Sequence, residues 1–293
     1  MSIRPTTLAL LGLALAACAH APADMPAPPP GSLADAWRQD VAAISAADDG
    51  DGRRQAVERR LSAIGLDWRP APFVREDERG TNLLAPVAGA ADAPLLLLGA
   101  HFDRVDTGRG ATDNASGTAV VLALAERLRE RPLARHRVAV ALWDLEERGL
   151  VGAHAYVEQA GERPALYVNF DVFGWGDTIW MMSPEAESAI ARATRDGARA
   201  AGIGLSVGEQ YPPTDHQAFL KAGWPAVSYS LVGASEIEGI LSMYAGKPPA
   251  TAPRVMDVIH SQHDTVEKVD AEAAARALDA IEDALRRWDA MAG

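Results

Sequence analysis

The sequence predicts a single α/β domain in which a mostly parallel central sheet is covered by helices on both faces. Short apolar segments alternate with amphipathic segments along most of the chain, as strands and helices do in α/β proteins. The segment 95–98 is apolar at every position, which indicates a strand buried on both faces. A chain of 293 residues, 48% of them hydrophobic, is long enough to form one large core.

The extreme N-terminus has the features of a targeting segment. Arg4 precedes an apolar stretch, residues 8–17, that is too short to span a bilayer. The stretch ends in Leu15-Ala16-Ala17-Cys18, which resembles the lipobox of bacterial lipoproteins. Cys18 is the only cysteine, so a chain acylated there has no thiol left for an intramolecular disulfide.

This segment divides the chain into three parts. We expect residues 1–17 to be a signal peptide and residues 18–31, which begin with a lipidated Cys18 and are rich in proline, to be a stiff tether. Residues 32–293 are expected to form the folded domain. Because Ala19 rather than aspartate follows the cysteine, the outer membrane is the expected destination, with the domain facing the periplasm or the exterior.

Periodicity and turn residues predict the elements in order. The acidic stretch 48–52 is read as a turn between the first two helices, since it lacks the closing glutamate of a calcium-binding loop. The helix at 115–131 follows a polar Asp-Asn pair and ends before Pro132. Residues 242–254 are expected to be irregular and could form a lid. Helices are expected at 34–47, 53–64, 115–131, 149–159, 185–201 and 270–291, with a short one within 212–222; strands are expected at 68–74, 81–87, 137–145, 165–170, 178–182 and 226–232, with a further one beginning at Leu95.

Side chains that suit metal ions follow several of these strands. His101 and Asp103 come at the end of the first fully apolar strand, and residues two apart in an extended chain share a face. Ligands of open α/β sheets bind outside the carboxyl ends of the strands. Further candidates follow other strands or lie in loops: Asp113, Glu146, Glu147, Asp171 and His260. Nitrogen and oxygen ligands without cysteine favour zinc or a similar divalent ion, and the share of carboxylates suits a two-metal site.

The motifs around these residues resemble the co-catalytic di-zinc exopeptidases of the secreted aminopeptidase type, which are related to glutamate carboxypeptidase II and the glutaminyl cyclases. The resemblance runs from residue 81 to the C-terminus. Its motifs are Gly-Ala-His101-Phe-Asp103, Gly-Ala-Thr-Asp113-Asn-Ala-Ser-Gly, Leu-Glu146-Glu147-Arg-Gly-Leu-Val-Gly, Asn-Phe-Asp171, Thr-Asp215-His216-Gln-Ala-Phe219 and His260-Ser-Gln-His-Asp264-Thr265.

The resemblance implies a role for each candidate. His101 and Asp171 would bind one zinc ion, Glu147 and His260 the other, and Asp113 would bridge the two. Glu146 would act as general base and acid, and Asp103 would orient His101. The chain would release N-terminal residues from peptide substrates with the help of two zinc ions.

The resemblance leaves the substrate pocket open. The family often has a tyrosine just before the last histidine, where it supports the tetrahedral oxyanion, but this chain has Ile259 there. Either the second metal carries the oxyanion alone, or a tyrosine reaches in from elsewhere; Tyr211, Tyr229 and Tyr244 are the candidates. Asp215 and His216 belong to a motif that lines the family's site.

Other functions were weighed against this interpretation. A single-zinc glutaminyl cyclase, a carboxypeptidase or dipeptidase, and a non-enzymatic binding module are the alternatives. The Gly-x-Ser-x-Gly pattern at 204–208 lacks the preceding strand and following helix that a serine hydrolase requires. The net charge of −12 argues against nucleic-acid binding. Contact with a membrane is expected only through a lipid on Cys18, and the sequence gives no oligomeric state.

Overall fold

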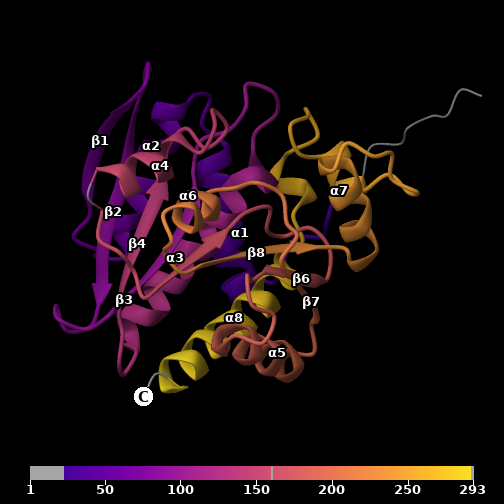
Figure 1. Ribbon diagram of the computed structural model, residues 1–293. Coiled ribbons are helices and arrows are strands. Elements are labelled where there is room, and N and C mark those ends of the chain that lie inside the picture. Colours follow the sequence, from indigo (N-terminus) through magenta and orange to yellow (C-terminus); the bar gives the residue numbers. More distant parts are fainter. Residues whose placement is uncertain (1–22, 160, 292–293) are drawn as a thin grey trace, which may run out of the picture.

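An eight-stranded sheet forms the centre of the molecule (Figure 1). The computed structural model describes residues 23–159 and 161–291; the signal-peptide and lipidation predictions therefore fall outside the described residues. The strands, in their order across the sheet, are β1 (Arg69–Arg75), β2 (Glu78–Ala88), β4 (Arg137–Trp143), β3 (Leu95–His101), β5 (Leu166–Phe170), β8 (Ala226–Val232), β6 (Thr178–Met182) and β7 (Gly204–Gly208).

The strands at the centre of the sheet are parallel. β4, β3, β5 and β8 pair in parallel, as do β6 and β7, whereas β1 with β2, β2 with β4, and β6 with β8 are antiparallel. The predicted mostly parallel α/β sheet is confirmed. Parallel pairing brings the carboxyl ends of β3, β4, β5 and β8 to one edge, where the candidate ligands follow them.

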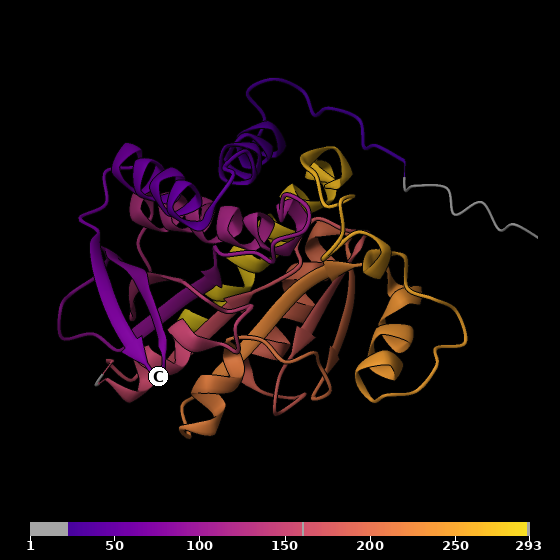
Figure 2. The same cartoon turned by 90° about the horizontal axis from the view of Figure 1, so that it is seen from above.

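Helices cover both faces of the sheet, and the residues of β3 show how. Leu96 and Leu98 belong to the larger core cluster, which also contains side chains of α1, α2, α3, α5 and α8. Leu95 and Leu97 point the other way and pack in a cluster with α4 and α6. Figure 2 shows the indigo helices α1 and α2 on one side of the sheet and the orange helix α6 on the other. The helices are α1 (Leu33–Ser45), α2 (Gly50–Ala63), α3 (Ser116–Glu130), α4 (Val151–Glu158), α5 (Ala189–Ala201), α6 (His216–Lys221), α7 (Ile237–Tyr244) and α8 (Ala271–Met291).

Four details differ from the sequence-based expectation. The acidic stretch after α1 is a helix start rather than only a turn, because the Asp49 side chain accepts the Gly52 N–H at 2.7 Å and α2 begins at Gly50. Helix α5 begins four residues later than expected, where the Ser188 side chain accepts the Ala191 N–H. The strand β7 and the helix α7 were not predicted. Since β7 contains the Gly-x-Ser-x-Gly pattern, that serine lies within a strand and not on a strand-to-helix turn.

The described part of the proline-rich segment packs against the domain. The Met25 N–H donates to the Glu267 carbonyl at 2.6 Å, Asp24 pairs with Lys268 at 2.6 Å, and Pro28 is buried. The first two contacts hold Asp24 and Met25 against the short 3₁₀ helix η4 (Val266–Lys268), which follows the predicted ligand loop at His260. The stiff tether predicted for residues 18–31 stays a prediction; within its described part, Asp24 and Met25 contact the domain.

Within residues 23–159 and 161–291, no helix combines the length and the apolar character that a membrane crossing requires.

Candidate active site

Five separate segments of the chain bring the predicted ligands together at the carboxyl edge of the sheet. His101 is the last residue of β3, Glu146 and Glu147 follow β4, and Asp171 follows β5. Asp113 lies in the π-helical turn η1 (Ala111–Ala115) that leads into α3, and His260 lies between the 3₁₀ helix η3 (Arg254–Asp257) and η4. Residues up to 159 positions apart thus meet at one place.

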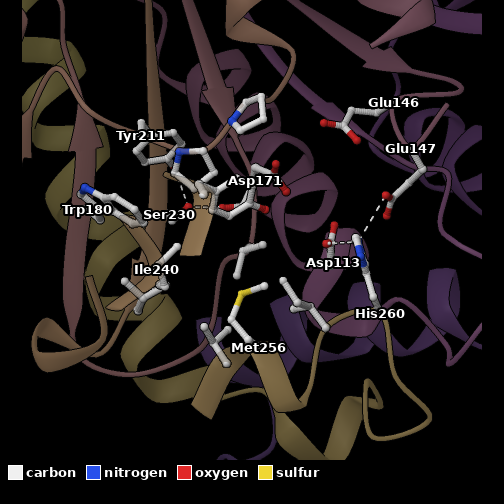
Figure 3. Close-up of a pocket in the computed structure, with 17 residues that line it drawn as sticks. Asp113, Glu146, Glu147, Asp171, Trp180, Tyr211, Ser230, Ile240, Met256 and His260 are labelled. Carbon is white, nitrogen blue, oxygen red and sulfur yellow. Dashed lines mark hydrogen bonds and ion pairs between the residues drawn. The ribbon is translucent and has the colours of Figure 1, made fainter. Parts of the chain in front are cut away.

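The ligand atoms form two groups that share Asp113. The Nε2 atom of His101 lies 3.3 Å from Asp113 Oδ1 and 3.3 Å from Asp171 Oδ1. On the other side, His260 Nε2 lies 3.1 Å from Asp113 Oδ2 and 3.2 Å from Glu147 Oε2 (Figure 3). In each group one ligand atom per residue lies within 4.8 Å of the others. The two oxygens of Asp113 therefore face two different histidines, which is the arrangement of a bridging carboxylate.

Asp103 connects three of these residues through its own carboxylate. Its Oδ1 lies 3.2 Å from His101 Nδ1 and accepts the Glu146 N–H at 3.0 Å, while its Oδ2 accepts the Glu147 N–H at 3.2 Å. With Nδ1 turned toward Asp103, the Nε2 atom of His101 is directed at the Asp113 and Asp171 oxygens. Asp103 is 6% exposed, so these contacts are shielded from water.

The electrostatics of the site favour a bound cation. Hydrogen bonds to Asp113 and Glu147 raise the pKa of His260 to about 10. Burial disfavours a charged His101, yet the surrounding carboxylates, Glu146 foremost, outweigh burial and raise its pKa well above the usual value. Both imidazoles are thus held in their protonated form by excess negative charge. A divalent ion in each group would supply that positive charge instead of the protons, so the residues fit a metal pair.

Glu146 lies beside the two groups without belonging to either. Burial raises the pKa of its carboxyl well above the usual value, and Asp215 and Asp171 add to the effect. Burial also raises the pKa of Glu147, whose Oε1 has no hydrogen-bond partner among the described residues. Glu147 therefore has acceptor capacity left for an ion, and Glu146 is the carboxyl best placed to exchange a proton.

The backbone near these residues is held in conformations that non-glycine residues rarely adopt. Leu145 (φ 60°) precedes Glu146, Val172 (φ 52°) follows Asp171, and His260 itself has φ 55°. The peptide bond between Asp113 and Asn114 is cis. Left-handed conformations cost energy, most of all for a β-branched residue, and they persist where the surrounding structure aims side chains at a site.

An apolar pocket adjoins the ligand groups. Its volume is about 110 Å³, and it is closed on the side away from the ligands by Trp180, Ile240 and Met256 (Figure 3). In the view of Figure 3, Asp171 lies between Trp180 and Asp113. The other apolar side chains that line the pocket are Val172, Pro212, Pro213, Val232, Val255 and Ile259.

The three candidate tyrosines occupy different places. Tyr211 and Tyr244 line the pocket, and the Tyr211 hydroxyl is hydrogen-bonded to Ser230 Oγ, which donates to the Asp171 carbonyl. Tyr229 was a wrong candidate, because its side chain is fully buried in β8 and its hydroxyl contacts Thr194 Oγ1 at 2.7 Å. Strand pleating explains the error, since Tyr229 points to the face opposite Ser230.

Asp215 and His216 do not line the apolar pocket. Both are buried, and neither is among the residues that line the cavity. Among the described residues, the Asp215 carboxylate and His216 Nδ1 have no hydrogen-bond partner. Burial raises the pKa of Asp215 well above the usual value and lowers that of His216 to about 4, so both side chains favour their neutral forms. Their contact with substrate stays a prediction.

A family model covers more than two thirds of the chain. Residues 82–285 match the model of peptidase family M28, a range that contains all five predicted metal ligands and Glu146. The chain belongs to peptidase family M28. The resemblance inferred from the sequence motifs is thereby confirmed.

Several relatives of this M28 chain carry informative names. Over 245 residues it is 28% identical to leupeptin-inactivating enzyme 1 of Streptomyces exfoliatus, covering 81% of this chain and 54% of that protein. Over 98 residues it is 39% identical to the probable lipoprotein aminopeptidase LpqL of Mycobacterium tuberculosis, covering 32% of this chain and 20% of that protein. The M28 chain thus spans about half or less of the length of these relatives.

Solved structures share the fold at low sequence identity. The M28 chain superposes on the zinc aminopeptidase BSAP of Bacillus subtilis with a TM-score of 0.59 and 21% identity, covering 72% of this chain and 50% of that one. It superposes on the glutaminyl cyclase of Porphyromonas gingivalis with a TM-score of 0.67 and 18% identity, covering 87% and 96% of the two chains. The zinc-exopeptidase fold predicted from the motifs is confirmed.

The sequence interpretation missed the apolar wall of the M28 site. Ile240 and Tyr244 belong to α7, and the apolar residues at 237, 240, 241 and 244 have helical spacing that could have revealed it. Trp180 and Met256 gave no local signal, because nothing in the sequence shows that β6 and η3 lie beside the ligand loops. His263, the other histidine of the last motif, belongs to neither ligand group, whereas His260 belongs to the group with Asp113 and Glu147.

Proposed function

We propose that this protein is a zinc-dependent aminopeptidase that removes N-terminal residues from peptides. The observation that carries the proposal is the position of Asp113, whose two oxygens face His101 and His260 in separate ligand groups. A carboxylate shared in this way is suited to hold two divalent ions close together. The relatives named as aminopeptidases support the choice of reaction.

Each residue of the site has a defined part in this reaction. His101 and Asp171 would hold one ion, Glu147 and His260 the other, and Asp113 would bridge them. Metal ions held by these residues would supply Lewis-acid activation of the scissile carbonyl and of the attacking water. The Glu146 carboxylate takes the proton of that water and delivers it to the leaving amine nitrogen. Asp103 fixes the His101 ring and the backbone of both glutamates.

We infer that the apolar pocket receives the side chain of the N-terminal residue. The wall formed by Trp180, Ile240 and Met256 carries no charge, and the charged end of the pocket is acidic. Such a pocket favours leucine, methionine or phenylalanine and disfavours aspartate and glutamate. Leucine aminopeptidase 2 of Trichophyton equinum, 36% identical over 103 residues, is named for such a preference.

We further propose that the mature chain is a lipoprotein of the bacterial cell envelope. Residues 1–17 would be removed, Cys18 would carry the lipid, residues 18–31 would connect the anchor to the domain, and residues 32–293 would form the peptidase domain. The lipobox pattern and the name of the LpqL relative support this assignment.

One experiment tests the reaction and the metal count together. The domain from residue 23 onward is purified, its zinc content is measured, and its hydrolysis of a panel of aminoacyl-anilides is recorded with and without a chelator. Two zinc ions per chain and chelator-sensitive cleavage of leucine-anilide are expected. One zinc, no cleavage and cyclisation of N-terminal glutamine would instead identify a glutaminyl cyclase.

A further inference from the structure

Helix α2 places a fully buried arginine directly behind the ligand loops. Arg53 is 0% exposed, and its guanidinium donates to three backbone carbonyls. Nε donates to Phe102 O, Nη1 to Arg109 O at 2.8 Å, and Nη2 to Gly110 O at 3.1 Å. A single side chain thereby joins two segments that lie about 50 residues further along the chain.

The charge of Arg53 is not neutralised by a direct ion pair. Among residues 23–159 and 161–291, no carboxylate lies within ion-pair distance of it; Asp103, Asp264 and Asp113 act on it only from further away. Burial lowers its pKa to about 10, so the side chain stays charged at neutral pH. Buried charges without an ionic partner are costly, and those that persist usually have a specific task.

The three carbonyls belong to the two segments that carry a histidine ligand and the bridging carboxylate. Phe102 lies between His101 and Asp103 at the end of β3. Arg109 and Gly110 form the entry to the turn η1, which contains Asp113. The guanidinium fork therefore sets how far the end of β3 lies from the turn that contains Asp113.

Asp264 holds the same turn from another direction. Its Oδ1 accepts the Thr112 N–H at 2.6 Å and its Oδ2 accepts the Asp113 N–H at 3.1 Å, while its carbonyl accepts the Arg109 N–H at 3.0 Å. The turn is thus fixed between a buried cation that binds its carbonyls and a buried carboxylate that binds its N–H groups. Asp264 lies within the M28 match, whereas Arg53 precedes it.

We propose that Arg53 is a positioning residue of the metal centre, which holds His101 and Asp113 at the separation that zinc requires before the metal binds. The inference rests on the proposed metal-dependent function. On this inference, helix α2, which lies outside the family match, contributes a residue that positions the metal ligands. Because Arg53 touches neither ligand side chain nor substrate, its effect reaches the metal only through the backbone of the two loops.

The test compares three variants of the purified domain. R53M keeps an apolar stem of similar length but removes all three donors. R53K keeps the charge, but its single ammonium nitrogen cannot donate to both loops as the spread N–H groups of a guanidinium do. R54M is the matched control, because Arg54 is the next residue of α2 and pairs with Asp51 and Glu58 at the surface. For each protein, the zinc dissociation constant is measured by competition with a chromogenic chelator, and the melting temperature is measured without metal.

We expect the zinc dissociation constant of R53M to rise about 10- to 100-fold, as for removal of groups that orient metal ligands. R53K should lie between R53M and the wild type, and R54M should match the wild type. A purely structural role would lower the melting temperature of metal-free R53M and leave the zinc affinity of its folded fraction unchanged; that result overturns the inference. If R53M does not fold, R53K decides: weakened zinc binding supports the inference, and wild-type affinity overturns it.

The outcome is separable from that of the proposed reaction. Wild-type protein that binds zinc without cleaving peptides would refute the aminopeptidase and leave the effect of Arg53 on zinc affinity standing. Wild-type zinc affinity in R53M, with peptide cleavage by the wild type, would refute the role of Arg53 alone.

Discussion

Replacing Asp103 with asparagine tests how the site is held together. The Asp103 carboxylate accepts three hydrogen bonds: two at Oδ1, from His101 and the Glu146 N–H, and one at Oδ2, from the Glu147 N–H. Asparagine has one acceptor oxygen. If that oxygen keeps the two contacts with His101 and Glu146, the new amide NH₂ faces the Glu147 N–H, donor against donor.

The structure sets the size of the expected effect. At least one hydrogen bond to a charged acceptor is lost, and such bonds contribute about 1.5–3 kcal/mol each. At about 1.4 kcal/mol per tenfold change, zinc affinity and kcat/KM should each fall by roughly 10- to 100-fold. These hydrogen bonds are present without metal, so the metal-free melting temperature should fall as well, by about 2–4 °C per kcal/mol lost, and zinc affinity is therefore compared at a temperature where both proteins are folded.

The assay is zinc competition together with leucine-anilide hydrolysis at saturating and limiting zinc. Asp106→Asn is the matched control, because Asp106 is an exposed residue three positions later in the same loop. Zinc affinity and kcat/KM of Asp103→Asn that both stay within about twofold of the wild type would refute the reasoning. Such a small change is less than the loss of one hydrogen bond to a carboxylate should cost.

Three other predictions follow from the site and its surroundings. Glu146→Ala should keep the bound zinc and lose about 100-fold or more of kcat, whereas Asp113→Ala should lose zinc as well; near-full activity of Glu146→Ala would contradict the assigned mechanism. Burial raises the pKa of Asp144 to about 6, so its ionised form destabilises the fold above that pH, and the penalty disappears as the pH falls toward the usual carboxyl range. Asp144→Asn, which keeps an acceptor for the Thr81 N–H, should therefore raise the metal-free melting temperature at pH 8 but not near pH 4, and an equal gain at both would contradict the burial argument. Cys18→Ser should release the full-length protein from the membrane fraction in cells, as blotting of fractions would show, and unchanged retention would argue against the lipid anchor.

The sequence was informative wherever a property depends on neighbours in the chain. The apolar run of β3, with Leu95 and Leu97 on one face and Leu96 and Leu98 on the other, predicted a strand buried on both sides. The polar residues that follow β3, β4 and β5 marked the edge of the sheet where a site would form. Helix and strand periodicity located most elements, with errors mainly at ends that depend on a capping side chain, such as Asp49 and Ser188.

The orientation of the tyrosines could not be read from the sequence. The sequence alone does not distinguish among the three candidates Tyr211, Tyr229 and Tyr244. Tyr229 is excluded only because the register of β8 against β5 and β6 turns its ring toward α5, where its hydroxyl meets Thr194. A one-residue shift of that register would turn Tyr229 to the other face of the sheet, so its orientation has to come from the observed strand pairing.

By itself, the sequence determined the fold class, the family and the set of candidate metal ligands, because these depend on local periodicity and on short motifs. Only the tertiary structure decided that the Asp113 oxygens face different histidines, that α7 closes an apolar pocket, and that Arg53 braces two loops of the site from a helix that precedes the family match. Each of these is a contact between segments distant in the chain. Their distances are set by the packing of α2, β3 and η1 against one another, and no local pattern in the sequence encodes that packing.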